Sequence, residues 1–298
     1  MVSLSRLNAR EFKQGQEIAS IGPGQVWRDV YHWLAQYGLA VNGGRYPTVG
    51  VGGYLVGGGI SCFSSTHGWG CDTVIAYEVV LADGSIVEAT ADGEYADLFW
   101  ALRGGHNNFG TVTRFDLETF AMTSAYFGGT IWDGNNASAQ TQFFSALDSY
   151  MIPGGGVDDP NVATSAIVSI ANETVVELAF AELANVSGAV AALTYQPISR
   201  DWLVASQRSG GNVIGLDPDS GTFIVNSFVE KAGSIIIEET TKLGLSHDFI
   251  YLNDASPTQR PFETYGGGKS LARLTQIRDK YDPDGFLQKC LAHGFGIP

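Results

Sequence analysis

The stretch from Gly43 to Gly59 constrains the fold of this chain more than any other. It contains the runs 49–53 (VGVGG) and 57–59 (GGG), with Tyr, Pro, Val and Leu interleaved. Glycine among apolar residues marks tight turns or the close approach of a ligand, not a flexible linker. On composition alone, ligand contact and simple packing explain this stretch equally well.

The same stretch does not match the Rossmann dinucleotide fold, which requires a strand, then glycines, then the start of a helix. Here residues 54–56 (YLV) are followed by more glycines and then by Ile60-Ser-Cys-Phe-Ser64. Backbone amides in glycine turns can still hold a pyrophosphate. The sequence contains no P-loop, GxSxG elbow, HExxH motif or CxxC spacing, so we expect no metal site.

The size and charge of the chain restrict its organisation and partners. Its 298 residues favour two packed units over a single core. The net charge of −14 disfavours nucleic acids and anionic membrane surfaces, which bind clusters of Lys and Arg. No apolar run approaches the ~18 residues needed to cross a bilayer. We therefore expect a small-molecule partner, with no nucleic acid and no membrane.

Residues up to about 120 predict a compact α+β unit. Apolar residues at helical spacing predict a helix over 25–38, with Gly38 just beyond its end. Alternation over 75–81, the turn at Asp83-Gly84 and residues 86–88 predict a hairpin. A short helix over 97–102, stopped by two glycines, and a strand over 110–115 follow.

From about Tyr126 the pattern predicts a second domain, an antiparallel sheet backed by helices. The predicted strands are 126–132, 163–170, 174–181 and 223–228, and the predicted helices are 137–150 and 231–243. A short strand over 249–253 and a helix over 268–280 close the chain, and residues 282–285 (DPDG) are typical of a turn. The three cysteines are expected to be small buried side chains, with a Cys62–Cys71 bridge as the alternative.

Several motifs resemble the flavin-binding core of the vanillyl-alcohol oxidase superfamily. They are the segments 43–61, 68–74 (GWGCDTV), 78–84 (EVVLADG) and 97–113 (DLFWALRGGHNNFGTVT). The closest similarity is to its berberine-bridge-enzyme-like branch, especially fungal FAD-linked oxidoreductases. Residues 249–253 (FIYLN) and 280–289 resemble the closing segment of that branch.

The resemblance implies an α+β fold. Residues 1–123 would form the second α+β subdomain of a PCMH-type FAD-binding domain. Residues 124–246 would form an abbreviated antiparallel-sheet substrate domain covered by helices. Residues 247–298 would return to the FAD domain. FAD would lie in an elongated slot between the family's two subdomains.

The resemblance also assigns site residues. The expected cofactor-binding residues are Thr48, Val49, Gly50, Gly52, Gly53, Gly57, Gly58, Val74, Gly110 and Val112. The expected catalytic residues are Tyr251 and Asn253, which match the family's Tyr-x-Asn element. A Tyr251 phenol of lowered pKa could act as a general base or orient the substrate, whereas an ordinary core tyrosine is an equally good interpretation.

Some positions depart from the family pattern. The first FAD subdomain, which carries a second pyrophosphate loop and the histidine joined to the flavin, is expected to be missing before Val2. The cysteine that some members join to the flavin corresponds here to Tyr46, and Asp254 stands where the family has tyrosine. FAD is therefore expected to bind without a covalent bond.

The resemblance implies an FAD-linked oxidase that acts on an alcohol, sugar or secondary-metabolite carbon with molecular oxygen as acceptor. The alternative is a truncated, inactive member that has lost tight flavin binding. Three glycosylation sequons, at Asn136, Asn172 and Asn185, suggest secreted ancestry although no signal peptide is seen.

Overall fold

The computed structural model describes residues 3–126, 128, 136–152, 154–159, 166–168, 193–220, 223–226, 241–242, 244, 247–290 and 294–298. The predicted strand over 174–181 lies outside these residues. The predicted strand over 126–132 and the predicted helix over 231–243 lie almost wholly outside them.

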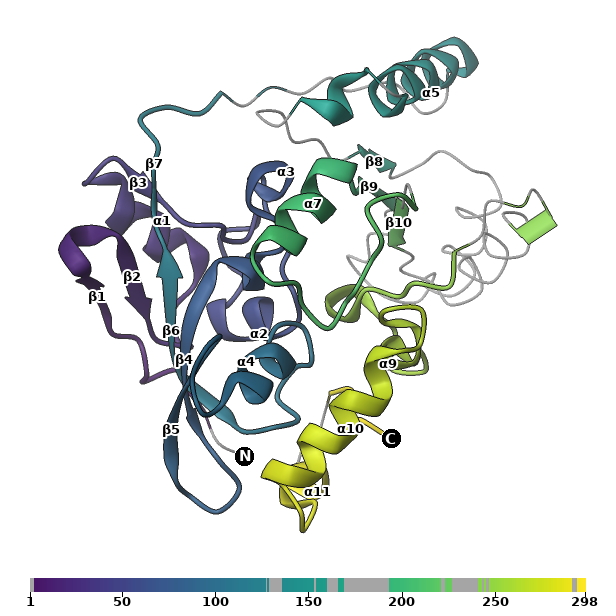
Figure 1. Cartoon of the computed structure of the whole chain (residues 1–298). Coiled ribbons are helices and arrows are strands. Elements are labelled where there is room, and N and C mark those ends of the chain that lie inside the picture. The colour runs from purple at the N-terminus through teal and green to yellow at the C-terminus, as the bar shows by residue number, and fades with distance from the viewer. Residues whose placement is uncertain are drawn as a thin grey trace, which may run out of the picture.

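A five-stranded antiparallel sheet organises the first part of the chain (Figure 1). Its strands run in the order β1 (Arg10–Lys13), β2 (Ile18–Ile21), β6 (Thr111–Glu118), β4 (Val74–Val80) and β5 (Ile86–Thr90). The predicted hairpin is confirmed, since β4 pairs with β5 across a turn in which Gly84 has a φ of 86°. The predicted strand over 110–115 is the start of β6. β1 and β2 were not predicted.

One face of this sheet forms the core. Tyr77 pairs with Phe115 and Ala89 across the strands, and all three are fully buried. The Tyr77 ring also contacts Phe99 of helix α4 (Ala96–Leu102) at 5.5 Å between ring centroids. Helices α1 (Trp27–Ala35) and α2 (Val51–Val56) contribute Trp27 and Leu55 to the same core.

The opposite face of the sheet is polar. Asp116 accepts hydrogen bonds from Lys13 at 2.9 Å, from Ser20 at 2.7 Å and from Arg114 at 3.1 Å. Arg114 also pairs with Glu78 on β4 and with Glu88 on β5. These contacts cross all five strands, and such a division into an apolar and a polar face is typical of an antiparallel sheet.

The helices predicted in this unit are confirmed with shifted ends. The helix predicted over 25–38 is α1, and Gly38 follows it with a φ of 66°. The helix predicted over 97–102 is α4. The stretch 51–56, which reads as part of a series of glycine turns, is instead the helix α2. Short elements complete the unit: η1 (Gln14–Gln16), β3 (Leu39–Ala40), α3 (Ser64–His67), η2 (Gly70–Thr73) and β7 (Phe120–Ala121).

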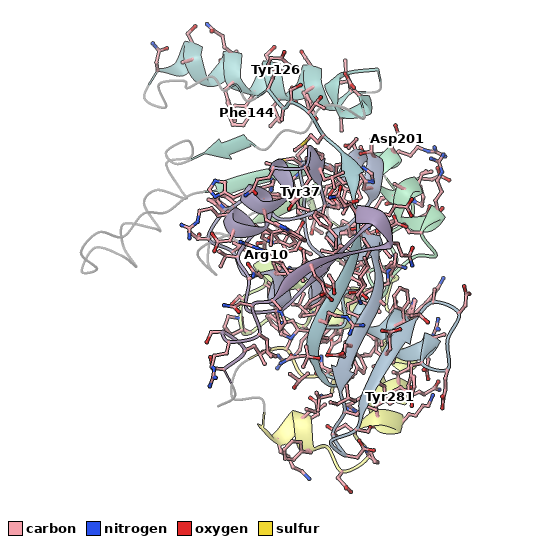
Figure 2. All side chains as sticks on the ribbon, turned by 90° about the vertical axis from the view of Figure 1, so that its left-hand side faces the viewer. Arg10, Tyr37, Tyr126, Phe144, Asp201 and Tyr281 are labelled. Carbon is pink, nitrogen blue, oxygen red and sulfur yellow. The ribbon has the colours of Figure 1, made fainter. Side chains whose placement is uncertain are left out.

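The second part contains a three-stranded antiparallel sheet in the order β10 (Phe223–Asn226), β9 (Leu193–Pro197), β8 (Ala166–Val168). Helix α7 (Arg200–Arg208) follows β9 and packs against α3 of the first unit (Figure 1). The predicted helix over 137–150 is α5 (Ala137–Met151), which η3 (Gly156–Asp158) follows. Figure 2 shows Phe144 of α5 and the fully exposed Tyr126 in a segment set apart from the five-stranded sheet.

The closing segment differs from the prediction at its start. Residues 249–253 form no strand; they are irregular and enter the 3-10 helix η4 (Leu252–Asp254). Helices α9 (Pro261–Thr264), α10 (Ser270–Tyr281) and α11 (Phe286–Cys290) follow, and α10 confirms the helix predicted over 268–280. Helix α10 packs on α4, where the Arg273 guanidinium lies 3.9 Å from the centre of the Trp100 ring.

Cys62 and Cys71 are both unbridged, and Cys62 is exposed, so its predicted burial is wrong, whereas Cys71 is buried as predicted. In the part of the chain that the structure describes, no helix has the length and apolar character needed to span a bilayer.

Candidate functional site

The predicted cofactor-binding residues fall in four separate places. Residues 48–53 lie on an exposed loop and the first turn of α2, and Gly57 and Gly58 lie just beyond the end of α2. Val74 begins β4, whereas Gly110 precedes β6. Because Val74 pairs with Leu117 and Val79 pairs with Val112, Val74 and Val112 lie at opposite ends of adjacent strands, about 17 Å apart. Only an elongated ligand could touch all four places.

The loop from Tyr46 to Gly50 is exposed and held by the start of α1. The first N–H groups of a helix have no partner within the helix. Here the Trp27 N–H donates to the Val49 carbonyl at 3.1 Å, and the Arg28 N–H donates to the Pro47 carbonyl at 2.9 Å. The backbone is therefore fixed although its side chains face solvent. A side chain on Gly53 would meet nothing within 4 Å, so the backbone there is open to a ligand.

Gly110 and Val112 are enclosed by the protein. A side-chain carbon on Gly110 would lie 2.5 Å from Cγ1 of Val79 and 2.9 Å from the Val80 carbonyl oxygen. Val112 is 6% exposed and Val74 is 2% exposed. Packing within the sheet accounts for the residue types at these positions. Their predicted contact with a cofactor stays a prediction.

The two predicted catalytic residues lie against the glycine turn 57–59. The Gly59 N–H donates to the Tyr251 hydroxyl at 2.8 Å, and Asn253 Nδ2 donates to the same oxygen at 3.0 Å. A side chain on Gly57 would overlap Oδ1 of Asn253. The structure therefore brings Tyr251 and Asn253 onto the glycine turn, nearly two hundred residues earlier in the chain. Space beside Gly57 is taken by protein atoms.

The Tyr251 phenol oxygen accepts both of these hydrogen bonds. Burial raises its pKa well above the ordinary value, and the two donated hydrogen bonds do not offset this. The condition of a lowered pKa, under which a general base was expected, is therefore not met. Since Gly59 and Asn253 both donate to the phenol oxygen, its own proton has no acceptor within the described residues.

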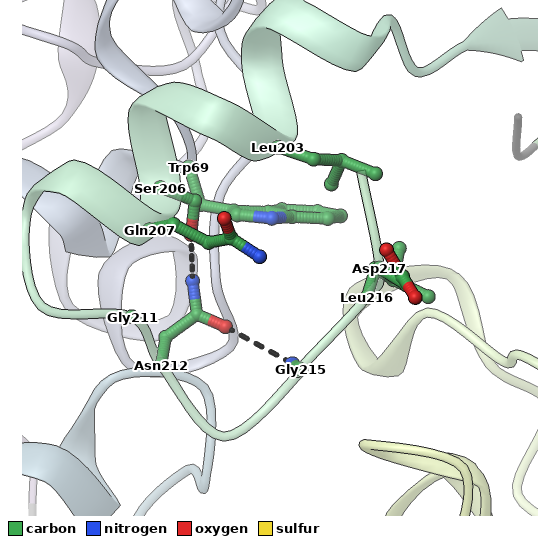
Figure 3. Close-up of a pocket in the computed structure, with 9 residues that line it drawn as sticks. All are labelled: Trp69, Leu203, Ser206, Gln207, Gly211, Asn212, Gly215, Leu216 and Asp217. Atoms are coloured by element: carbon green, nitrogen blue, oxygen red, sulfur yellow. Dashed lines mark hydrogen bonds between the residues drawn. The ribbon is translucent and has the colours of Figure 1, made fainter. Parts of the chain in front are cut away.

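Trp69 connects this pair with a cavity of about 340 Å³ (Figure 3). Its ring lies 5.2 Å from the Tyr251 ring and 4.9 Å from Trp202 of α7, between ring centroids. Asn42 fixes the backbone beneath it by donating to the carbonyls of Gly68 and Trp69. The cavity is lined by Trp69, Leu203, Ser206, Gln207, Gly211, Asn212, Gly215, Leu216 and Asp217.

Sequence reasoning missed the residues that shape this cavity. Trp69 lies in the segment 68–74, and its buried neighbour Asp72 lies there too. Arg103, in the segment 97–113, is buried and donates to Asp72 and to the loop after α7. A charged pair inside motifs rich in apolar residues was a signal that could have identified them, because buried charges require partners.

Comparison with known proteins connects the whole chain to flavoproteins. A model of the FAD binding domain family matches residues 1–90. The chain is 32% identical to the FAD-dependent monooxygenase prx3 of Penicillium roqueforti over 397 aligned residues, covering 100% of this chain and 77% of that protein. It is 30% identical to the FAD-dependent monooxygenase tpcD of Cochliobolus heterostrophus, covering 99% of this chain and 76% of that protein.

Solved structures show the same fold at lower identity. The xylooligosaccharide oxidase of Myceliophthora thermophila superposes with a TM-score of 0.67 at 21% identity, covering 99% of this chain and 80% of that one. The 6-hydroxy-D-nicotine oxidase of Arthrobacter nicotinovorans superposes with a TM-score of 0.66 at 18% identity, with 99% and 81% covered. The fold is thus that of the vanillyl-alcohol-oxidase-type flavoproteins.

Proposed function

Because the chain belongs to the FAD-linked oxidoreductases of the vanillyl-alcohol oxidase superfamily, we propose that it holds FAD without a covalent bond and oxidises an alcohol, sugar or secondary-metabolite carbon with molecular oxygen as acceptor. The observation that supports the proposal best is the seating of Tyr251 and Asn253 on Gly57–Gly59, beside Trp69 and its cavity. One phenolic proton is left to donate there.

The exposed segment 48–53 fits the diphosphate part of FAD. Its backbone is fixed against α1, and Gly53 offers open space where a bulky anion could approach. Position 46 holds a phenol in place of a thiol, so no cysteinyl bond to the flavin forms there. A side chain on Gly57 would meet Asn253, and one on Gly58 would meet Ile214 and Tyr251, so these glycines contribute by leaving room for the catalytic pair.

Tyr251 orients the substrate oxygen in this proposal. A phenol of raised pKa stays protonated at neutral pH, so it donates a hydrogen bond and does not remove a proton. Asn253 Nδ2 also donates to the Tyr54 carbonyl at 3.3 Å, which holds the pair against α2. The chemistry that FAD supplies when bound is removal of a hydride from the substrate carbon, with oxygen finally reduced to hydrogen peroxide.

Reconstitution with FAD tests this proposal. We expect the purified protein to acquire a flavin absorbance spectrum that is lost on denaturation and filtration, since no covalent bond holds the cofactor. Oxygen uptake with a panel of alcohols and sugars should match the hydrogen peroxide formed. Tyr251→Phe should lower turnover about 10-fold or more while the flavin still binds. A folded protein that acquires no flavin even in excess FAD contradicts the proposal and supports the inactive alternative.

A second candidate function is monooxygenation, because the relative at 32% identity is named as a monooxygenase. The two reactions differ in the fate of oxygen. An oxidase returns both oxygen atoms as hydrogen peroxide, whereas a monooxygenase places one atom in the product. Turnover under ¹⁸O₂ with mass analysis of the product distinguishes them, and a labelled product would overturn the oxidase assignment.

A further inference from the structure

Arg103 is a buried cation without a part in the proposed chemistry. It follows the last residue of α4 and is 2% exposed. Its Nε donates to the Cys71 carbonyl at 3.0 Å, and its Nη2 donates to the Asp72 carbonyl at 2.6 Å. These two bonds attach the guanidinium to the segment that carries Trp69.

The other side of the same guanidinium holds the end of α7. Nη1 donates to the Ser209 carbonyl at 2.9 Å and to the Gly211 carbonyl at 2.6 Å. Carbonyls at the end of a helix lack partners within the helix and attract positive charge. Arg103 therefore fixes the position at which α7 ends and the loop 209–217 begins, and Gly211 of that loop lines the cavity.

Asp72 extends these contacts to the rest of the cavity wall. It lies 3.5 Å from Nη2 of Arg103 and accepts from Asn212 Nδ2 at 2.7 Å. Asn212 in turn donates to Ser206 Oγ at 2.9 Å and accepts from the Ile214 N–H at 3.0 Å. Asp72 also accepts from the Trp69 N–H at 2.8 Å, so one carboxylate holds both Trp69 and Asn212 of the loop 209–217. Figure 3 shows the hydrogen bond between Asn212 and Ser206.

We propose that Arg103 is a positioning residue. It holds the loop 209–217, which forms one wall of the Trp69 cavity, against the unit that carries the glycine segment. Its side chain donates four hydrogen bonds to backbone carbonyls of two segments that lie more than a hundred residues apart in the sequence. A guanidinium fork can span such a set, whereas the single ammonium of lysine cannot. Its effect on substrate affinity rests on the proposed function, but its effect on the loop does not.

Hydrogen exchange of the protein as purified tests the proposal without a ligand. In Arg103→Met, we expect amides of 203–217 to exchange about tenfold faster, because the loop loses two charge-assisted bonds. Arg103→Lys should show the same change to a smaller extent, and it remains informative should Arg103→Met fail to fold. Arg114→Met is the matched control, since Arg114 is paired with three carboxylates on the far face of the sheet and is not among the residues that line the Trp69 cavity.

The control should leave exchange of 203–217 unchanged and speed exchange in the strands of the sheet. Unchanged exchange of 203–217 in both Arg103 variants would overturn the proposal. So would an equal acceleration throughout the protein, which is what general destabilisation produces.

A kinetic measurement extends the test to the FAD-loaded enzyme. For any alcohol that the wild-type enzyme oxidises, Arg103→Lys should raise KM about tenfold and keep kcat within about twofold, because the cavity wall moves and Tyr251 does not. A loss of about tenfold in kcat with KM unchanged would contradict a positioning role. Absence of turnover in the wild-type enzyme would count against the proposed function, and hydrogen exchange would still decide the role of Arg103.

Discussion

Tyr251 shows how one side chain depends on distant backbone. Its hydroxyl accepts from Gly59 and Asn253, and Gly57 leaves the room that the Asn253 amide occupies. Gly58 and Gly59 have φ values of 111° and 93°, which other residues rarely adopt. The glycines of this turn thus serve the chain's own closing segment.

Gly57→Ala and Gly53→Ala form a matched pair within α2 and its end. Gly57→Ala should displace Asn253, lower the free energy of unfolding by about 1–3 kcal/mol and reduce turnover. Gly53→Ala meets open space and should leave stability unchanged or raise it by up to ~1 kcal/mol.

Urea unfolding and FAD titration of both variants provide the measurement. If FAD approaches the backbone at Gly53, as proposed, Gly53→Ala weakens FAD binding without loss of stability. Full activity in Gly57→Ala would contradict the seating of the Tyr251–Asn253 pair as a functional feature.

At the scale of elements, helix ends are satisfied by chemically different partners. The start of α1 is held by backbone carbonyls of the loop 47–49. The start of α11 is held by Asp282, whose two carboxylate oxygens accept from the N–H groups of Phe286 at 2.7 Å and Leu287 at 2.8 Å. Asp282 is 2% exposed, so the DPDG segment is both a turn and a helix cap.

Asp282→Ala should therefore lower the free energy of unfolding by about 1–2 kcal/mol, since two N–H groups lose a charged acceptor. The Asp284 side chain, two residues later, is exposed. Asp284→Ala should therefore change the free energy of unfolding by less than about 0.5 kcal/mol. Thermal unfolding of the two variants side by side makes the comparison. Equal stability of both would show that the cap contributes nothing.

At the scale of the whole molecule, buried phenols are spread through the core. Burial raises the pKa of Tyr54, Tyr77, Tyr251 and Tyr265 above the ordinary value near 10. These residues come from both ends of the sequence. Folding of the entire protein is thereby linked to their protonation.

Above pH ~10 the unfolded chain loses phenolic protons that the folded protein keeps, so stability is complete below that pH and falls as pH rises. Each phenol contributes a slope of up to about 1.4 kcal/mol per pH unit. Denaturant unfolding at pH 9, 10 and 11 measures the slope. Tyr77→Phe should reduce the slope by one proton with little change at pH 7, because the buried Tyr77 hydroxyl has no hydrogen-bond partner among the described residues. A flat profile would contradict the linkage.

The sequence by itself determined the features whose signals are local. Alternation with Asp83-Gly84 specifies the β4–β5 hairpin, and helical spacing specifies α1, α4, α5 and α10. Ordered motifs specify the family, because glycines and apolar residues recur at fixed positions. The residues that close on the glycine turn, Tyr251 and Asn253, could also be named.

Only the tertiary structure decided how these pieces meet. The stretch 249–253 (FIYLN) was predicted to be a strand, yet it pairs with no strand among the described residues and instead places Tyr251 on Gly59. Helix α2 is a glycine-rich segment of low helix propensity, and burial of its apolar side chains in the core stabilises the helical conformation. Arg103 acquires its role from carbonyls of segments 71–72 and 209–211. Such contacts depend on distance in space, which no local pattern encodes.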